Sequence, residues 1–150
     1  MINGTALLDV NVLVAFLWTE HIHHERARSW LSSASERVWA TCPLSELGCI
    51  RVLAGQTLTQ NRFTVQSAEA LLRAFISRER HEFWPDHLQT ITGEFSASLR
   101  HIQGPKQLTD RYLLALAASH DGTFVTFDRS VGAGLPSDSP LLSHLEVINV

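Results

Sequence analysis

The chain has 150 residues, of which 45% are hydrophobic and 18% charged, and its formal net charge is −3. This composition excludes an intrinsically disordered chain. A chain of this length can bury enough apolar surface to fold without disulfides or a structural metal, so we expect one domain over residues 1–150. The negative net charge argues against a protein that holds nucleic acid by overall positive charge alone.

Cysteine usage and hydropathy indicate a cytoplasmic protein. Cys42 and Cys49 form no C-x-x-C motif, and two thiols do not make a disulfide framework, so we expect both in the core. The first residues lack the basic start and long apolar run of a signal peptide. No apolar run reaches the roughly 20 residues that span a bilayer, so no membrane segment is predicted.

The first half of the chain alternates short apolar runs with helical patterns. Residues 5–8 form an apolar run that predicts a buried strand, and the run ends at Asp9. Asp9 or Asn11 can cap the helix that follows. The other elements predicted here are a helix over 24–33, a strand over 37–41, a helix over 44–53 and a polar loop over 55–64.

The second half continues the alternation. Residues 67–80 predict an amphipathic helix, with Ala70, Leu71, Ala74 and Phe75 on its apolar side. The remaining predicted elements are a strand over 83–85, a helix over 88–102 interrupted by Gly93, a helix from 109 that ends at Asp121-Gly122, a strand over 123–127 and a last strand over 145–148. Strands that alternate with helices predict an α/β fold with a parallel central sheet flanked by helices on both faces.

Two aspartates follow predicted strands directly. Asp9 follows the first strand, and Asp128 follows the strand over 123–127. In open α/β sheets, ligands bind outside the carboxyl ends of the strands. Both aspartates are therefore expected at one edge of the sheet, although each taken alone is also compatible with an ordinary strand-end cap.

Two further acids lie on apolar helix faces. Glu46 shares its face with Cys49 and Leu53, and Asp110 shares its face with Leu113 and neighbouring apolar residues. A carboxylate on such a face is costly unless something pairs with it. Taken alone, Asp110 is also compatible with a helix-start residue favoured by the helix dipole, and Glu46 with the outer edge of its apolar stripe.

Together, the four acids predict a metal site. Clustered carboxylates repel one another and raise one another's pKa values. A hard cation such as Mg²⁺ or Mn²⁺ relieves that repulsion and prefers oxygen ligands. Such an ion can activate water for hydrolysis of a phosphodiester, and the sequence offers no obvious nucleophile and base pair as an alternative.

Four segments, spread in order along the chain, resemble the motifs of PIN domains. They are Leu7-Leu8-Asp9-Val10-Asn11-Val12-Leu13, Pro43-Leu44-Ser45-Glu46 followed by Arg51-Val52-Leu53, Leu108-Thr109-Asp110 followed by Tyr112-Leu113-Leu114-Ala115-Leu116-Ala117, and Val125-Thr126-Phe127-Asp128. Their order and spacing agree over nearly the whole chain. The combination is most similar to VapC-type toxins of toxin–antitoxin systems.

The resemblance implies a metal-dependent endoribonuclease that cleaves RNA, forms a homodimer and is blocked by a small antitoxin. It implies Mg²⁺ or Mn²⁺ bound by Asp9, Glu46, Asp110 and Asp128. It further implies residues that support these ligands or orient the substrate, namely Asn11, Ser45, Thr109 and Thr126.

The sequence departs from the family pattern at two places. Arg111 stands where the third motif often has a small residue, and Val131 replaces an aromatic residue that often follows the fourth motif. Arg111 and Arg129 each follow a site aspartate, so they are read either as phosphate contacts or as solvated surface arginines. These departures affect the expected substrate more than the expected chemistry.

Three other functions compete with this interpretation. A haloacid-dehalogenase-like phosphatase needs an acid two residues after Asp9, where this chain has Asn11, and a suitable lysine, whereas Lys106 is the single lysine. A zinc site built from His21, His23 and His24 lacks a partner at a standard zinc spacing. A catalytically inactive PIN-fold binding module is the third, and the presence of all four acids gives it no support.

Overall fold

The computed structural model describes residues 4–55, 60, 62–78 and 80–150. Its centre is a five-stranded sheet in which every neighbouring pair of strands is parallel. The predicted parallel α/β fold is therefore confirmed. The strands are β1 (Ala6–Leu8), β2 (Trp39–Thr41), β3 (His81–Phe83), β4 (Thr123–Thr126) and β5 (Leu145–Val147).

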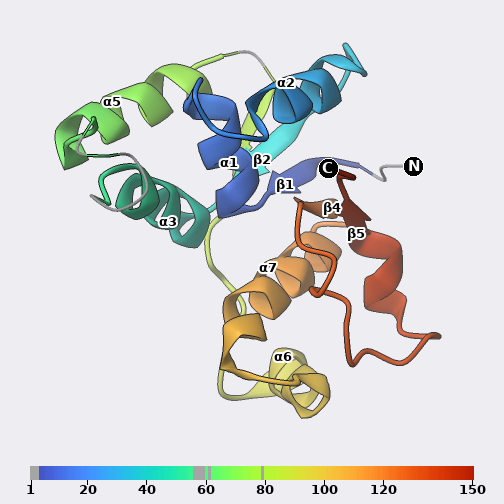
Figure 1. Cartoon of the computed structure of the whole chain (residues 1–150). Coiled ribbons are helices and arrows are strands. Elements are labelled where there is room, and N and C mark those ends of the chain that lie inside the picture. Colours follow the sequence, from blue (N-terminus) through green and yellow to red (C-terminus); the bar gives the residue numbers. More distant parts are fainter. Residues whose placement is uncertain (1–3, 56–59, 61, 79) are drawn as a thin grey trace.

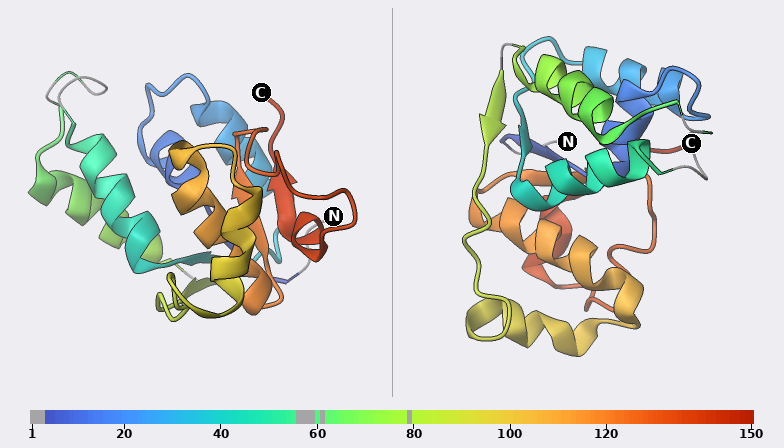
Figure 2. Two further views of the ribbon diagram at one scale, coloured as in Figure 1. Left: turned by 90° about the horizontal axis from the view of Figure 1, so that it is seen from below. Right: turned by 90° about the vertical axis from the view of Figure 1, so that its left-hand side faces the viewer.

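Helices cover both faces of this sheet (Figure 1). One layer holds α1 (Val10–Leu17), α2 (His24–Ser32), α3 (Pro43–Leu53) and α5 (Val65–Ile76). The other holds α6 (Gly93–Ser98), α7 (Leu108–Ser119) and three short 3₁₀ turns, η1 (Leu99–His101), η2 (Pro105–Gln107) and η3 (Pro140–His144). The right-hand view of Figure 2 separates the two layers. Within the described residues, no helix is long and apolar enough to cross a bilayer.

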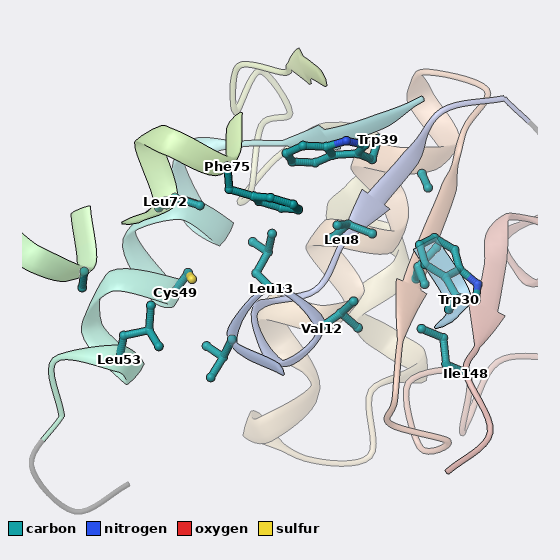
Figure 3. Packing of buried hydrophobic residues seen from close by; sticks show 14 residues of the cluster. Leu8, Val12, Leu13, Trp30, Trp39, Cys49, Leu53, Leu72, Phe75 and Ile148 are labelled. Carbon is teal, nitrogen blue, oxygen red and sulfur yellow. The ribbon is translucent and has the colours of Figure 1, made fainter. Parts of the chain in front are cut away.

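Side-chain alternation along the strands divides the core between the two faces. Leu8 and Trp39 point into the layer of α1, α3 and α5, where Trp39 stacks on Phe75 at 4.2 Å between ring centroids (Figure 3). Leu7 and Phe124 point to the opposite face and pack against α7. Successive side chains on a strand point to opposite faces of the sheet. Because helices cover both faces, both sets of side chains are buried, so a continuous apolar run is expected.

The strand order is β3-β2-β1-β4-β5. The chain builds the sheet outward from β1 to β3, then crosses to the other side of β1 and adds β4 and β5. The register pairs Leu8 with Val125, so β1 and β4 end at the same edge. Ligands of open α/β sheets bind where the strand order reverses in this way, and here that place is the carboxyl edge between β1 and β4.

The helix predicted over 67–80 is misplaced by a few residues. Helix α5 begins earlier because Thr64 caps it: its Oγ1 accepts a hydrogen bond from the Ser67 amide at 3.0 Å. Its buried residues are Ala68, Leu72 and Phe75. The predicted face was therefore wrong in part, since Ala70 and Ala74 are exposed. Alanine favours helix on either side, so it marks a face poorly.

Two other predictions need adjustment, and a third lies partly outside the described residues. The helix predicted over 88–102 is shorter in the structure and consists of α6 and η1. Gly93, the first residue of α6, has a φ of +81°, a backbone conformation that prevents regular helix from continuing into the residues before it. The strand over 83–85 lies instead at His81–Phe83, since Pro85 has no N–H to donate and Trp84 leaves the sheet to stack on His120. The predicted loop over 55–64 includes residues 56–59 and 61, which lie outside the described residues.

Candidate functional site

Asp9 and Asp128 are joined through one hydroxyl group. Asp9 is 4% exposed at the end of β1, where it is also the N-cap of α1. The buried Thr126 hydroxyl donates to Asp9 Oδ2 at 2.6 Å and accepts the Asp128 amide at 3.0 Å. Asp128 Oδ1 in turn accepts the Ser130 amide at 2.8 Å. The carboxyl edge of β1 and β4 therefore holds two aspartates in a fixed hydrogen-bonded arrangement.

Asp110 joins these two aspartates electrostatically from the first turn of α7. Burial, followed by the charges of Asp9 and Asp128, raises the pKa of Asp110 to about 6. Burial is also the main reason that the pKa of Asp9 is raised, with Asp128 adding to it and the Thr126 hydrogen bond opposing it. The charges of Asp9 and Asp128 thus disfavour the ionised form of Asp110, and the charge of Asp128 disfavours that of Asp9.

Glu46 lies in the first turn of α3 and belongs to a different hydrogen-bonded group. Its Oε1 accepts the hydroxyl of Thr41 at 2.6 Å, and the same Thr41 oxygen lies 2.8 Å from His81 Nε2. A hydroxyl has one proton to give, so His81 must carry the hydrogen on Nε2 and donate it to Thr41. Glu46 is therefore oriented from β2 and β3 through two side chains.

The oxygen-rich donor set fits a hard divalent cation. Across the part of the chain that the structure describes, no three His, Cys, Asp or Glu side chains form a ready-made metal cluster. Mg²⁺ needs none, because it keeps several water molecules and is commonly held by one or two carboxylates. Burial is the main reason that the pKa values of Asp9 and Asp110 are raised, and neighbouring carboxylates add to it. A bound cation would favour the ionised forms of both groups.

The other residues expected near the site lie in distinct surroundings. Asn11 is exposed and lines a pocket with Asp128. The buried Ser45 hydroxyl accepts the Cys42 amide at 3.0 Å and donates to the Cys42 carbonyl at 3.1 Å, so it fixes the start of the helix that carries Glu46. Thr109 is exposed and lines an apolar pocket of about 250 Å³ between the N-terminal ends of α3 and α7.

The two arginines that follow site aspartates differ sharply. Arg111 is fully buried and donates to the Ala133 carbonyl at 3.4 Å. It is therefore neither a solvated surface arginine nor an accessible phosphate contact, but ties the loop after β4 to α7. Arg129 is exposed and lies 3.4 Å from Asn149 Oδ1.

Sequence reasoning missed Thr41 and His81. Thr41 ends the buried strand β2, and a polar residue at the end of a buried strand is the signal that also marked Asp9 and Asp128. His81 carried no such signal, because its role depends on strand pairing that brings β3 beside β2.

The raised pKa of Asp110 predicts a pH-dependent stability. A folded-state pKa of about 6, against an ordinary value of 3.8, means that this group's stabilising contribution is present at low pH and is lost as the pH rises from about 4 to about 6. We expect Asp110→Asn to remove this loss and, in EDTA at pH 7, to raise the free energy of unfolding by about 1 kcal/mol after allowing for solvent screening of a half-buried group.

Urea unfolding at pH 4 and pH 7 in EDTA measures this effect, with the exposed Asp138→Asn as the matched control. Divalent cations should favour the unmodified protein instead. Mg²⁺ or Mn²⁺ should raise its melting temperature more than that of Asp110→Asn. Equal pH dependence in both proteins would contradict the raised pKa assigned to Asp110.

Comparisons with known proteins identify the family and relatives of this chain. The family model for the PIN domain matches residues 6–132. Three ribonucleases of Mycobacterium tuberculosis are similar over most of the chain. Ribonuclease VapC44 is 43% identical over 84% of this chain and 87% of its own length. Ribonuclease VapC39 is 42% identical over 87% and 96%, and Ribonuclease VapC29 is 40% identical over 83% and 86%.

Proposed function

Since this chain belongs to the PIN domain family, we propose that it is a Mg²⁺- or Mn²⁺-dependent endoribonuclease, the toxin component of a type II toxin–antitoxin system. The similarity to ribonucleases named VapC supports the activity and the class. It also favours this reading over the phosphatase alternative, which Asn11 already made poor.

The observation that carries the proposal is the group of carboxylates at the reversal of strand order. Asp9 and Asp128 are fixed through Thr126, and Asp110 faces them from α7. This group is poorly suited to bind phosphate by itself, because its charge has the same sign as the phosphate. It is well suited to bind a divalent cation that offers positive charge to both the protein and the RNA.

The residues divide the work as follows. Asp9, Asp110 and Asp128 would hold the cation, and Glu46 would complete the acidic site from α3. The cation, when bound, supplies an activated water and stabilises charge on a phosphoryl oxygen. Thr126 orients Asp9, while Thr41 and His81 orient Glu46. Holding Asp9 and Glu46 by hydrogen bonds limits the reorganisation needed when the metal and RNA bind.

The first test is cleavage of total cellular RNA by the purified protein, with Mg²⁺ or Mn²⁺ and with EDTA. We expect discrete fragments that require the metal. Fragments that persist in EDTA would contradict metal dependence. Failure to cleave any RNA in either metal would favour the catalytically inactive PIN-fold binding module.

The proposal also covers the partner proteins and the cellular location. We infer an antitoxin protein that covers the acidic site, a homodimer as the assembled toxin, and action in the cytoplasm, where RNA is available. Co-expression with a candidate antitoxin, followed by size-exclusion chromatography with light scattering, tests the first two. A monomer that no candidate antitoxin binds would contradict both.

A further inference from the structure

A pocket of about 370 Å³ opens directly beside the acidic site. Its volume falls in the range of roughly 300–1,000 Å³ that is usual for small-molecule sites. Two of its lining residues belong to the expected site, and the other four supply aromatic or apolar surface. The lining is Asn11, His21, Ile22, His23, Phe127 and Asp128.

Aromatic rings form a continuous series along this pocket. The ring of His23 lies 5.2 Å from that of Phe127, His21 lies 5.6 Å from His23, and Trp18 lies 5.8 Å from His21. Phe127 immediately precedes Asp128, so the series ends next to a site carboxylate. Ile22, 86% exposed, adds an apolar side chain that has no cover.

The segment between α1 and α2 that carries these histidines is held in place. His24 is buried and its Nδ1 lies 2.8 Å from the Ala15 carbonyl, to which it donates. The His23 amide donates to His21 Nδ1 at 3.0 Å, so a neutral His21 ring carries its hydrogen on Nε2. This arrangement pre-organises the rings, which lowers the entropic cost of binding.

The geometry gives no support to a zinc site at His21, His23 and His24. Among the described residues, no group of three His, Cys, Asp or Glu side chains that could hold a metal ion includes them. The three histidines therefore need another explanation than zinc binding.

Building on the proposed ribonuclease function, we propose that this pocket binds one unpaired nucleobase of the RNA, beside the phosphate that is cleaved. The base stacks on the ring of His23, with the tilted ring of Phe127 beside it, and the exposed Asn11 amide and His21 Nε2–H lie in the same pocket as donors and acceptors for its edge. RNA-binding proteins commonly recognise unpaired bases by stacking them on aromatic or histidine rings.

The negative net charge of the chain means that its affinity for RNA needs a contribution other than attraction to phosphate. The chain has a net charge of −3 and gathers carboxylates at the site, so long-range attraction to phosphate is weak. Stacking on aromatic rings does not depend on net charge and accepts every base to some degree. His23 therefore holds the base in the pocket by stacking, in a position where Asn11 and His21 can contact its edge.

The test compares His23→Ala and His23→Phe with the unmodified protein. The substrates are total RNA and single-stranded homopolymers of A, C, G and U, in Mn²⁺. We expect His23→Ala to lower kcat/KM by roughly 5- to 150-fold and to relax the base preference at one position next to the cut, read by sequencing the fragment ends. His23→Phe keeps a flat ring and should retain most of the activity and the preference.

His120→Ala is the matched control, because the ring of His120 also contacts an aromatic ring, Trp84, but at the amino edge of the sheet. It should cleave like the unmodified protein. An unchanged metal-induced shift in melting temperature shows that His23→Ala leaves the fold and the acidic site intact.

Each contrary result has a distinct meaning. Full activity and unchanged base preference in His23→Ala would overturn the nucleobase pocket while leaving the ribonuclease in place. Equal loss in His23→Ala and His23→Phe would overturn stacking, since an imidazole nitrogen would then be essential. Absence of cleavage by the unmodified protein would overturn the proposed function and the pocket's role with it.

Discussion

Asp9→Asn should lower RNA cleavage by about 1,000-fold, on the scale seen when one group that stabilises transition-state charge is lost. Asparagine keeps the volume and one oxygen of this 4%-exposed side chain but removes the charge that would hold the cation. Because burial raises the pKa of Asp9, the neutral amide should not destabilise the fold. Initial cleavage rates in Mn²⁺ and thermal unfolding in EDTA measure the two effects separately.

Asp121→Asn is the matched control for this substitution. Asp121 is exposed at the amino edge of the sheet and has a φ of +51°, which asparagine also tolerates. It should keep full activity. Asp9→Asn should in addition lose most of the metal-induced rise in melting temperature. If Asp9→Asn cleaved RNA at the normal rate, the carboxylate of Asp9 would have no part in catalysis.

The architecture was predictable because a few short segments are recognisable as buried strands from their own residues alone. Residues 6–8 and 123–126 are buried on both faces of the sheet, and such strands are typical of a parallel sheet with a helical layer on each side. Predictions failed where contacts with residues far away in the sequence determine which side chains face the core. Leu72 rather than Ala70 faces the core, because the partner surface of α3 is formed by residues far away in the sequence.

Some features of the site were likewise recognisable in the sequence, whereas others depend on the tertiary structure. Asp9 and Asp128 stand out in the sequence because an acid after a buried strand needs an explanation. Their link through Thr126 and the network from His81 to Glu46 depend on strand order, which brings β4 beside β1 and β3 beside β2. Arg111 was misread for a related reason, since an arginine after an aspartate does not reveal that the loop after β4 covers it.

Thr126→Val should weaken metal binding and RNA cleavage by about 10- to 100-fold, the range typical of groups that orient metal ligands. Valine matches threonine in shape but lacks the hydroxyl that donates to Asp9 and accepts the Asp128 amide. Both aspartates then lose the bond that fixes them. The buried Asp9 oxygen also loses a partner, which should lower the free energy of unfolding by about 1–3 kcal/mol.

Two further variants separate orientation from general loss of stability. Thr126→Ser keeps the hydroxyl and should restore most of the metal affinity, measured by titrating Mn²⁺ while following the melting temperature. Thr123→Val alters a buried threonine at the amino end of the same strand, so it should cost stability without changing metal affinity. If Thr126→Val and Thr123→Val bound Mn²⁺ equally well, the Thr126 hydroxyl would serve only the packing of β4, because a group that orients Asp9 cannot be removed without changing how the site binds its cation.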